Sequence, residues 1–444
     1  RRYPATPLAE QMHMAFDDSF KRLLEPSISN EVIKEAKEKA DIESIRIFGE
    51  NLRQLLLAPP VGQKRVLAID PGFRTGCKVV CLDQQGNLLH NEAIFPHPPA
   101  SEKIKSIQAV SAMVQKYGIE VIAIGNGTAS RETEEFIKRV PLPKGVRVFT
   151  VSEDGASIYS ASEVARAEFP DSDVTVRGAV SIGRRLMDPL AELVKIDPKA
   201  IGVGQYQHDM PPKRLDEALG GVVEDCVNAV GVDVNTASAS LLEQVAGLNS
   251  TTAKNIVLFR QENGPFTGRT QIKKVPKLGP KAFEQCAGFL RVPESKEILD
   301  NTGVHPESYK AASKLLEICG YDKSALSKGG LSELMERLEG YGFDKAADAC
   351  GVGVPTLLDV AKELMKPGRD PRDELPAPIL RTDVLEMKDL KPGMVLTGTV
   401  RNVIDFGIFV DIGVHQDGLV HISQVAKHKV RHPSEVAQVG DVVK

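Results

Sequence analysis

The chain has no tryptophan, few aromatic residues of any kind and no paired cysteines. Aromatic residues make up 5% of its 444 residues, and its six cysteines include no Cys-x-x-Cys pair and no nearby histidine grouping. This spacing excludes the common zinc-binding patterns and fits a reducing cytosol. No apolar run approaches the roughly 18 residues that a membrane span needs. We therefore expect a cytoplasmic protein that holds no metal or cofactor and contacts no membrane.

Length and charge set the next limits. A chain of 444 residues exceeds what one hydrophobic core usually organises, so we expect several domains. The formal net charge of −4 gives no global sign of a polyanionic partner. Locally, residues 254–281 carry seven lysines and arginines against one glutamate, a balance of 7 − 1 = +6. A solvated helix face is the simplest explanation of such a run, but the motifs inside it point to a second one.

Residues 393–444 alternate apolar and polar side chains across short stretches separated by glycines. This pattern predicts short strands. If Ile408 and Val410 face a core, the period of two turns Phe409 outward, and the same count turns His421 away from Val420. Exposed rings on strands are typical of oligonucleotide-binding barrels, where each stacked base contributes roughly 1–3 kcal/mol.

The Phe406-Gly407 pair, the Phe409-Val410 pair and residues 417–423 resemble the RNA-binding repeat of ribosomal protein S1 in order and spacing. The resemblance implies a five-stranded barrel that lacks its end, because such a barrel normally continues for another strand beyond Lys444. The alternative is that the two phenylalanines complete a small core. The residues that we expect to bind nucleic acid here are Phe406, Phe409, His421, Lys427, Lys429 and Arg431.

Two glycine-containing turns lie between predicted helices in the basic region. Gly247 and Asn249 belong to the first turn and Lys277 and Gly279 to the second, and each has one of the two glycines of a helix-hairpin-helix motif. Such turns bring backbone N–H groups and a helix N-terminus to a phosphate. We expect phosphate contacts from these four residues and from Lys254 and Lys281. Since asparagine tolerates left-handed dihedrals better than lysine, the first hairpin is the predicted clamp and the second a packing element. The alternative is a helical bundle whose tight turns need small residues.

Residues 63–195 alternate strand and helix patterns. A buried strand ends at Asp70, a hairpin follows over residues 78–87, and strands over 119–124 and 146–151 enclose a helix that a Gly125–Gly127 turn opens. This order is typical of a ribonuclease-H-like domain and resembles the RuvC and YqgF group.

A nuclease of that group needs three or four carboxylates around paired divalent ions. Asp70 occupies the first position, and Glu153 fits a later one. Gly125 follows the strand where another acid belongs, and the helix around residues 177–183 has no carboxylate before Asp188. We therefore predict that the domain is not an enzyme and that Asp70 and Glu153 are vestigial. The alternative is a metal-dependent nuclease that uses these two acids.

Several longer stretches of the sequence resemble one known family, and they are distributed over the whole chain. They are residues 71–78, 125–134, 155–162, 202–209 and 304–309, and together they resemble the bacterial Tex family of transcription accessory factors. The resemblance implies a multidomain α+β fold, a degenerate YqgF domain and nucleic-acid binding in gene expression. RNA or single-stranded DNA is the expected partner, with duplex DNA and RNA polymerase as further candidates. We expect a monomer.

The expected domain plan combines these motifs. It comprises a helical N-terminal segment over 1–62 with Asn30 capping its second helix, a ribonuclease-H-like domain over 63–195, a helix-hairpin-helix domain over 196–310, a small helical domain over 311–365, a linker over 366–385 and an incomplete OB-fold barrel over 386–444. In this plan the hairpins hold phosphates and the barrel stacks bases. A third possibility is a platform for RNA polymerase in which nucleic acid matters little.

Overall fold

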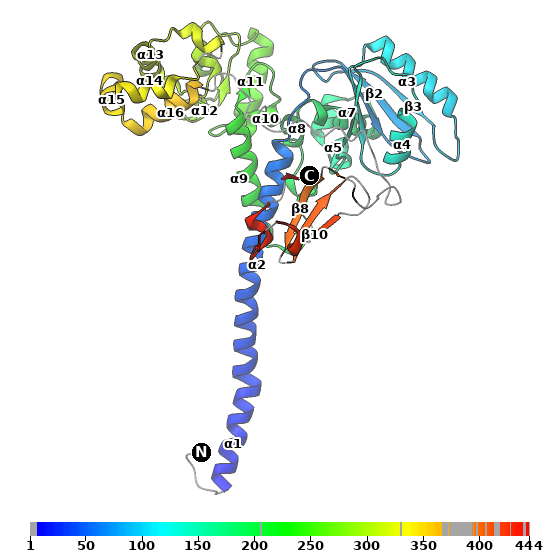
Figure 1. The fold of residues 1–444 in the computed structure, drawn as a ribbon, viewed down its shortest axis with the longest axis vertical. Helices are drawn as coiled ribbons and strands as arrows, with labels where there is room; N and C mark the ends of the chain where they lie inside the picture. The colour runs from blue at the N-terminus through cyan, green and yellow to red at the C-terminus, as the bar shows by residue number, and fades with distance from the viewer. Residues whose placement is uncertain are drawn as a thin grey trace. The chain divides into compact units, whose positions relative to one another are not determined.

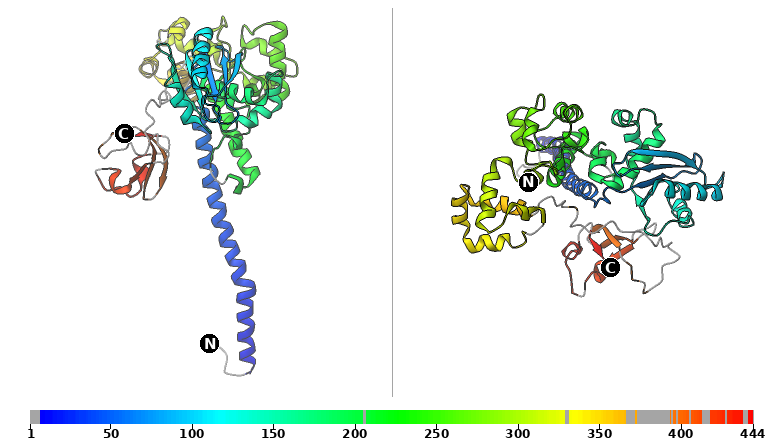
Figure 2. Two further views of the ribbon diagram at one scale, coloured as in Figure 1. Left: turned by 90° about the vertical axis from the view of Figure 1, so that its right-hand side faces the viewer. Right: turned by 90° about the horizontal axis from the view of Figure 1, so that it is seen from above.

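A computed structural model gives the fold in two compact units (Figures 1 and 2). One unit combines residues 1–56 with 196–365, and the other combines residues 57–195 with 366–444. The residues that the structure describes are 7–204, 207–328, 331–365, 372, 393, 395–396, 398–404, 406–412, 418–426, 428–437 and 441–443. Within these ranges, no helix has the length and apolar character of a membrane span. The predicted linker lies outside the described residues except for Arg372.

The first unit begins with an uninterrupted helix, drawn in blue in Figure 2. It comprises α1 (Pro7–Ser19), a π-helical turn (Phe20–Leu24) and α2 (Glu25–Leu56). The predicted cap at Asn30 is wrong, because Asn30 lies inside α2. The surrounding glutamates, lysines and alanines favour helix strongly enough to carry one asparagine.

The C-terminal part of α2 packs against α9 (Pro212–Val230). The two backbones approach closely at Gly49, where a Cβ atom would lie 3.3 Å from Val222 Cγ2. Further toward the N-terminus, large apolar side chains of the long helix are exposed, among them Phe16 and Phe20. Packing therefore supports this helix mainly at its C-terminal end.

The hairpin region follows α9. Its elements are β6 (Val232–Asp233), α10 (Ala239–Glu243), α11 (Ser250–Asn263), the 3-10 helix η4 (Arg269–Lys274), α12 (Pro280–Cys286) and β7 (Leu290–Arg291), with β6 and β7 paired in parallel. Leu242, Ile256 and Ile272 are fully buried beneath the turns. Tertiary packing therefore fixes the positions of both hairpins.

A small helical domain completes the first unit. It contains η5 (Ile298–Asn301), η6 (Pro306–Ser308), α13 (Tyr309–Ile318), η7 (Lys323–Lys328), α14 (Leu334–Tyr341), α15 (Phe343–Cys350) and α16 (Val354–Met365) around a leucine-rich core. Arg269 of η4 joins this domain to the hairpin region. Its side chain is 1% exposed and donates hydrogen bonds to the carbonyl oxygens of Leu290 at 2.7 Å and Val304 at 2.8 Å. Such buried, charge-assisted contacts favour one fixed arrangement of the two domains.

The second unit contains a five-stranded sheet in the order β3-β2-β1-β4-β5. The strands are β1 (Val66–Asp70), β2 (Cys77–Leu82), β3 (Leu88–Ile94), β4 (Val121–Gly125) and β5 (Arg147–Val151). The pairs β1–β2 and β2–β3 are antiparallel, and β1–β4 and β4–β5 are parallel. This topology confirms the predicted ribonuclease-H-like layout.

Helices cover both faces of the sheet (Figure 1). The helices α3 (Lys103–Tyr117) and α4 (Ser130–Ile137) pack on one face, and α7 (Val174–Met187) packs on the other. A Cβ atom at Gly183 of α7 would lie 2.7 Å from Leu82 Cδ1, so this glycine permits close packing. Shorter helices are α5 (Ala156–Ala161), α6 (Glu163–Glu168) and α8 (Pro189–Leu193).

The C-terminal domain is a small antiparallel sheet in the order β10-β9-β8-β11. Its strands are β8 (Gly398–Ile404), β9 (Gly407–Asp411), β10 (Gly418–His421) and β11 (Val442–Val443). Val400, Ile408 and Val410 form its core with Ala437. The fold class is thus the predicted one: a multidomain α+β protein with a helical N-terminal segment, a ribonuclease-H-like domain, helical hairpin domains and a β-barrel-type C-terminal domain.

Candidate nucleic-acid interface

The outer face of the C-terminal sheet carries a row of side chains across three strands. Phe409 of β9 pairs with Asn402 of β8 on one side and with Leu419 of β10 on the other. Ile408 and Val410, the neighbours of Phe409 along β9, are each 4% exposed, so Phe409 points to the opposite face. The expected outward direction of Phe409 is confirmed.

Phe406 and His421 extend this row. Phe406 is 51% exposed, and its ring centroid lies 6.4 Å from that of Phe409 at an interplanar angle of 77°. His421 is exposed, pairs in register with Gly407 and has Nδ1 at 2.9 Å from Ser423 Oγ. We call Asn402, Phe406, Phe409, Leu419 and His421 the aromatic face.

Gly407 keeps the aromatic face open between Phe406 and His421. A Cβ atom there would lie 2.6 Å from the carbonyl oxygen of Val420 and 2.9 Å from Leu419 Cδ1. Any side chain at this position would therefore displace β10 or Leu419. The glycine is required by the close approach of two strands.

Sequence reasoning missed two members of the aromatic face. Leu419 is 50% exposed and stands two residues before His421, so the same period of two could have found it. Asn402 is exposed, but a β-bulge between Val400 and Asn402 shifts its register, which a strict alternation does not anticipate. Lys429 and Arg431 are exposed near β10 in the sequence. Lys427 lies outside the described residues.

The two hairpins have the same backbone geometry. Gly247 and Lys277 adopt left-handed dihedrals with φ of 81° and 65°, while Asn249 and Gly279, two residues later, are extended N-caps of α11 and α12. We expected Asn249 to tolerate left-handed dihedrals better than Lys277, but it is Lys277 that adopts them and Asn249 that does not. Packing of each turn decides the conformation, and it outweighs the intrinsic preference of lysine.

Asn249 has a different role, as the cap of α11. Its side-chain oxygen accepts the backbone N–H of Thr252 at 3.0 Å, and Thr252 Oγ1 accepts the N–H of Asn249 at 2.8 Å. This capping box leaves the N–H groups of Ser250 and Thr251, in the first turn of the helix, without an intrahelical partner. Those groups and the helix dipole make the end of α11 electropositive.

Lys277 lies beside this helix end. A hollow of about 410 Å³ is lined by Asn249, Ser250, Thr251, Thr252 and Lys277, and we call it the Lys277 hollow. Asn255 Nδ2 donates to the carbonyl oxygen of Pro276 at 2.7 Å and holds the second turn against α11. The second hairpin thus contributes to the same hollow as the first. The other predicted contacts, Gly247, Gly279, Lys254 and Lys281, are exposed but do not line it.

Sequence reasoning also missed a third hairpin, between α15 and α16. Gly351 is left-handed with φ of 69° and donates its N–H to Ala347 O, and Gly353 accepts the N–H of Leu357 at 2.9 Å. The Gly351-Val352-Gly353 sequence has both glycines of the motif that the first two hairpins share only in part. The signal was present in the sequence, in the segment that we predicted only to be a small helical domain.

Asp70 and Glu153 meet at one edge of the ribonuclease-H-like sheet. Burial, and then the negative charge of Glu153, raise the pKa of Asp70 to about 6. A Cβ atom at Gly178 of α7 would lie 3.7 Å from Asp70 Oδ2, so the helix residue facing Asp70 is a glycine. A carboxylate is therefore missing where the helix could have supplied one.

The Gly125–Gly127 turn is filled by the protein's own carboxylate. Glu153 accepts the backbone N–H of Gly127, and its own N–H is donated to Asn126 Oδ1 at 3.0 Å. Burial raises the pKa of Glu153, and the N–H of Gly127 offsets part of that rise. Within the described ranges, no three His, Cys, Asp or Glu side chains are grouped so as to hold a metal ion. The residues present do not fit a pair of divalent ions.

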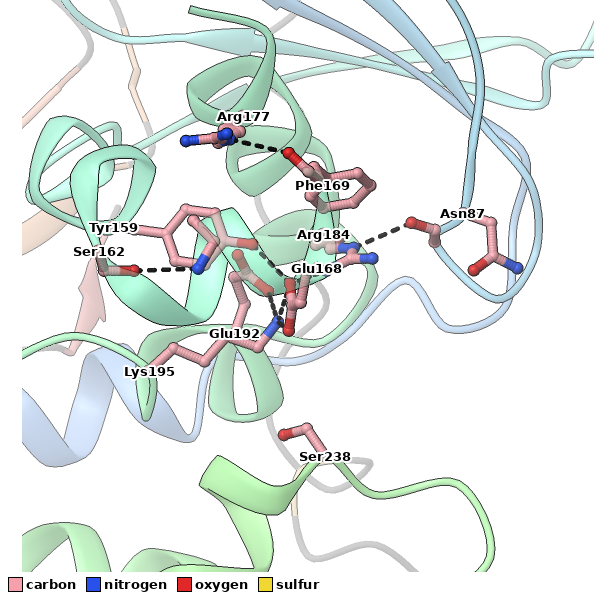
Figure 3. A network of polar contacts seen from close by, with 12 residues as sticks. Asn87, Tyr159, Ser162, Glu168, Phe169, Arg177, Arg184, Glu192, Lys195 and Ser238 are labelled. Carbon is pink, nitrogen blue, oxygen red and sulfur yellow. Dashed lines mark hydrogen bonds and ion pairs between the residues drawn. The ribbon is translucent and has the colours of Figure 1, made fainter. Parts of the chain in front are cut away.

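A buried polar network lies elsewhere in the same domain (Figure 3). Glu168 accepts hydrogen bonds from Tyr159 at 2.6 Å and Arg184 at 2.7 Å, and Lys195 donates to Glu192 at 2.8 Å. Burial raises the pKa of Tyr159 well above its ordinary value. These groups pair with one another across α5, α6, α7 and α8, so the network explains the packing of helices.

A ribonuclease-H-like domain, helical hairpins and an outward-facing aromatic row on one chain define a class of multidomain nucleic-acid-binding proteins. Comparison with family models agrees. The models matched are the Tex protein YqgF-like domain over residues 64–187, a helix-hairpin-helix motif over 227–291, an HHH domain over 297–372 and the S1 RNA binding domain over 389–444. The chain belongs to the Tex family.

Curated relatives support the same assignment. The chain is 49% identical to Protein tex of Bordetella pertussis over 446 residues, which cover 99% of the chain and 55% of that protein. It is 50% identical to the transcriptional accessory protein Tex of Neisseria gonorrhoeae over 422 residues, 94% of the chain and 54% of that protein. The chain thus spans about half the length of these relatives.

Among solved structures, T. thermophilus RuvC in complex with Holliday junction substrate matches 27% of this chain and 90% of that chain. The sequence identity is 18% and the TM-score is 0.19. A likeness at this level carries no argument about activity.

Proposed function

We propose that this chain is a nucleic-acid-binding part of a transcription accessory factor and that it binds RNA or single-stranded nucleic acid. The aromatic face is the observation that carries the proposal. Phe406, Phe409 and His421 present ring surfaces to solvent on a sheet that matches the S1 RNA binding domain. Base stacking on such rings is tolerant of sequence, so we expect weak sequence preference.

Phosphate contacts complete the proposed mode of binding. The Lys277 hollow combines one ammonium group with the free N–H groups at the start of α11. These groups complement the negative charge of a phosphodiester. In this division of labour, the hairpins supply affinity that depends on salt, and the aromatic face supplies affinity that depends less on it.

Substitution of both phenylalanines tests the aromatic face. A Phe406→Ala/Phe409→Ala variant of the chain should bind poly(U) RNA at least about 10-fold more weakly, because each lost stacking contact costs roughly 1–3 kcal/mol. Phe16→Ala is the matched control, since Phe16 is also exposed but lies on α1. Unchanged affinity of the double variant in a fluorescence anisotropy titration would reject the proposal.

We infer that the ribonuclease-H-like domain is not a nuclease. Asp70 and Glu153 are two acids where three or four are needed, and Glu153 is already bound to the Gly127 N–H. In this proposal the domain has a structural role.

RNA polymerase is the protein partner that we propose. The name of the gonococcal relative refers to transcription, and a factor that acts in transcription has to reach the polymerase or its transcript. Affinity capture of purified polymerase by the chain, carried out after nuclease treatment, separates a direct contact from one bridged by RNA. If nuclease treatment abolished the capture, the proposed direct contact with the polymerase would be rejected. The proposed binding of RNA would not be affected.

A further inference from the structure

A second hollow lies on the small helical domain, and it shares no lining residue with the Lys277 hollow. It has a volume of about 430 Å³ and is lined by Tyr309, Lys310, Ser313, Lys314, Glu317 and Lys323. Three lysines against one glutamate give the lining a balance of 3 − 1 = +2. We call this site the Lys310 hollow. Its charge and shape suit an anion better than an apolar or cationic ligand.

Two of the three lysines of this hollow can be reached by a ligand at little cost, whereas Lys323 pairs with Glu297 at 3.2 Å. Lys310 is exposed and forms no ion pair with any described residue. Lys314 pairs with Glu317 at 3.0 Å, but the two side chains are 47% and 70% exposed. Exposed pairs of this kind contribute about 0–1 kcal/mol, so an arriving phosphate can replace the glutamate.

The floor of the hollow is rigid and is connected to the hairpin region. Tyr309 donates its hydroxyl hydrogen to Asp300 Oδ1 at 2.6 Å and accepts from Arg269 Nη1 at 2.7 Å. Arg269 begins η4, which leads directly into the turn that contains Lys277. Both hollows therefore belong to one unit and are linked by buried hydrogen bonds.

The helix that carries Lys314, α13, also packs against α15, which ends at the third hairpin. Burial raises the pKa of the Cys350 thiol, and the charge of Lys314 offsets part of that rise. Cys350 is the last residue of α15, immediately before Gly351. The Lys310 hollow thus lies on a helix, α13, that packs against the helix ending at the third hairpin.

We propose that the Lys310 hollow is a second phosphate-binding surface, which contacts the same nucleic acid strand as the Lys277 hollow. The inference rests on the proposed function and extends it from one hairpin pair to the small helical domain. Two basic hollows on one unit suit a continuous polyanion, because a strand that reaches both gains the phosphate contacts of each. An acidic protein segment is the competing ligand and becomes an outcome of the test.

Salt dependence is the measurement that detects a lost phosphate contact. For single strands, the logarithm of the binding constant falls with the logarithm of salt concentration by about 0.7 per phosphate neutralised. The Lys310→Ala/Lys314→Ala variant of the chain should therefore show a slope for poly(U) RNA that is smaller by about 1 to 1.5 than the wild-type slope. Lys310→Arg/Lys314→Arg should keep the wild-type slope, because it keeps both charges.

Lys362→Ala is the matched control, since Lys362 is an exposed lysine of α16 that does not line the hollow. An unchanged slope in the double alanine variant, together with a reduced slope in Lys277→Ala, would overturn the Lys310 hollow and leave the proposed function intact. An acidic protein segment would then remain as the competing ligand of this hollow. A wild-type chain that does not bind poly(U) RNA would overturn the proposed function itself.

Discussion

Lys277 adopts in the second hairpin the left-handed backbone that Gly247 adopts in the first, with φ of 65° and 81° respectively. A residue with a Cβ atom pays about 1–2 kcal/mol for this conformation, whereas glycine does not. A lysine held there against its preference is consistent with a role for its charge, since the Lys277 hollow is otherwise lined by uncharged side chains. Stability and binding are thus expected to oppose each other at this position.

Lys277→Gly should therefore stabilise the fold and weaken binding. We expect a gain of about 0.5–1 kcal/mol, because relief of the left-handed strain exceeds the entropy that glycine adds to the unfolded chain. Binding of poly(U) RNA should weaken as one phosphate contact is lost. Lys277→Ala is the matched control: it also loses the charge but keeps the strain, so its thermal transition should not rise. If the Lys277→Gly variant bound RNA as tightly as the wild type, Lys277 would not be part of the RNA-binding interface.

Asn249→Ala should destabilise α11 and weaken binding at the same hollow. The substitution removes the capping box with Thr252, and loss of an asparagine cap costs about 1 kcal/mol. The variant should therefore unfold at a lower temperature in a thermal melt. Asn249→Ser keeps a side-chain cap and should restore most of the loss. Equal transitions for the alanine and serine variants would show that the cap contributes little here.

Local pattern predicted what depends on a single strand or turn. The period of two along β9 placed Phe409 on the outer face because Ile408 and Val410 had to fill the core. The absence of an acid near residues 177–183 was likewise visible before the structure placed Gly178 opposite Asp70. In both cases the property follows from residues that are neighbours along the chain.

Features that depend on tertiary packing were not predicted. The left-handed conformation of Lys277 contradicts its intrinsic preference, and only the packing of the turn against α11 explains it. The filling of the Gly125–Gly127 turn by Glu153 brings the end of β4 together with the second residue after β5, which no local pattern encodes. Asn402 belongs to the aromatic face because a β-bulge between Val400 and Asn402 shifts the register of β8. The third hairpin differs from these features, because its two glycines are visible in the sequence and could have predicted it.

Asp70→Asn should stabilise the chain at neutral pH and not in acid. The pKa of Asp70 is about 6 in the folded chain against an ordinary 3.8, so the folded state keeps the proton while the unfolded state releases it. The contribution of the protonated Asp70 side chain to the free energy of unfolding is therefore fully present below about pH 4. It is lost as the pH rises to 6, and the loss is at most about 3 kcal/mol. Asparagine does not ionise, so the Asp70→Asn variant should keep this stability as the pH rises. Thermal melts at pH 4 and pH 7.5 should show a higher transition for the variant only at pH 7.5.

Glu132→Gln is the control for this pH dependence, because Glu132 is exposed on α4. Its melts should follow those of the wild type at both pH values. A gain for Asp70→Asn that is the same at pH 4 and pH 7.5 would show that the effect does not come from ionisation of Asp70.

The geometry of the sheet edge predicts that the chain does not cleave nucleic acid when magnesium or manganese is added. Two-ion hydrolysis needs enough oxygen ligands to hold both ions and orient the attacking water. Here Asp70 faces Gly178, and Glu153 is engaged by the Gly127 N–H. Incubation with labelled branched DNA, single-stranded DNA and RNA should leave each substrate intact, while binding to the same RNA stays measurable. Cleavage by the wild type that Asp70→Asn abolishes would establish a nuclease; cleavage that survives this substitution would indicate a contaminating activity, because no reaction at this edge could proceed without its buried acid.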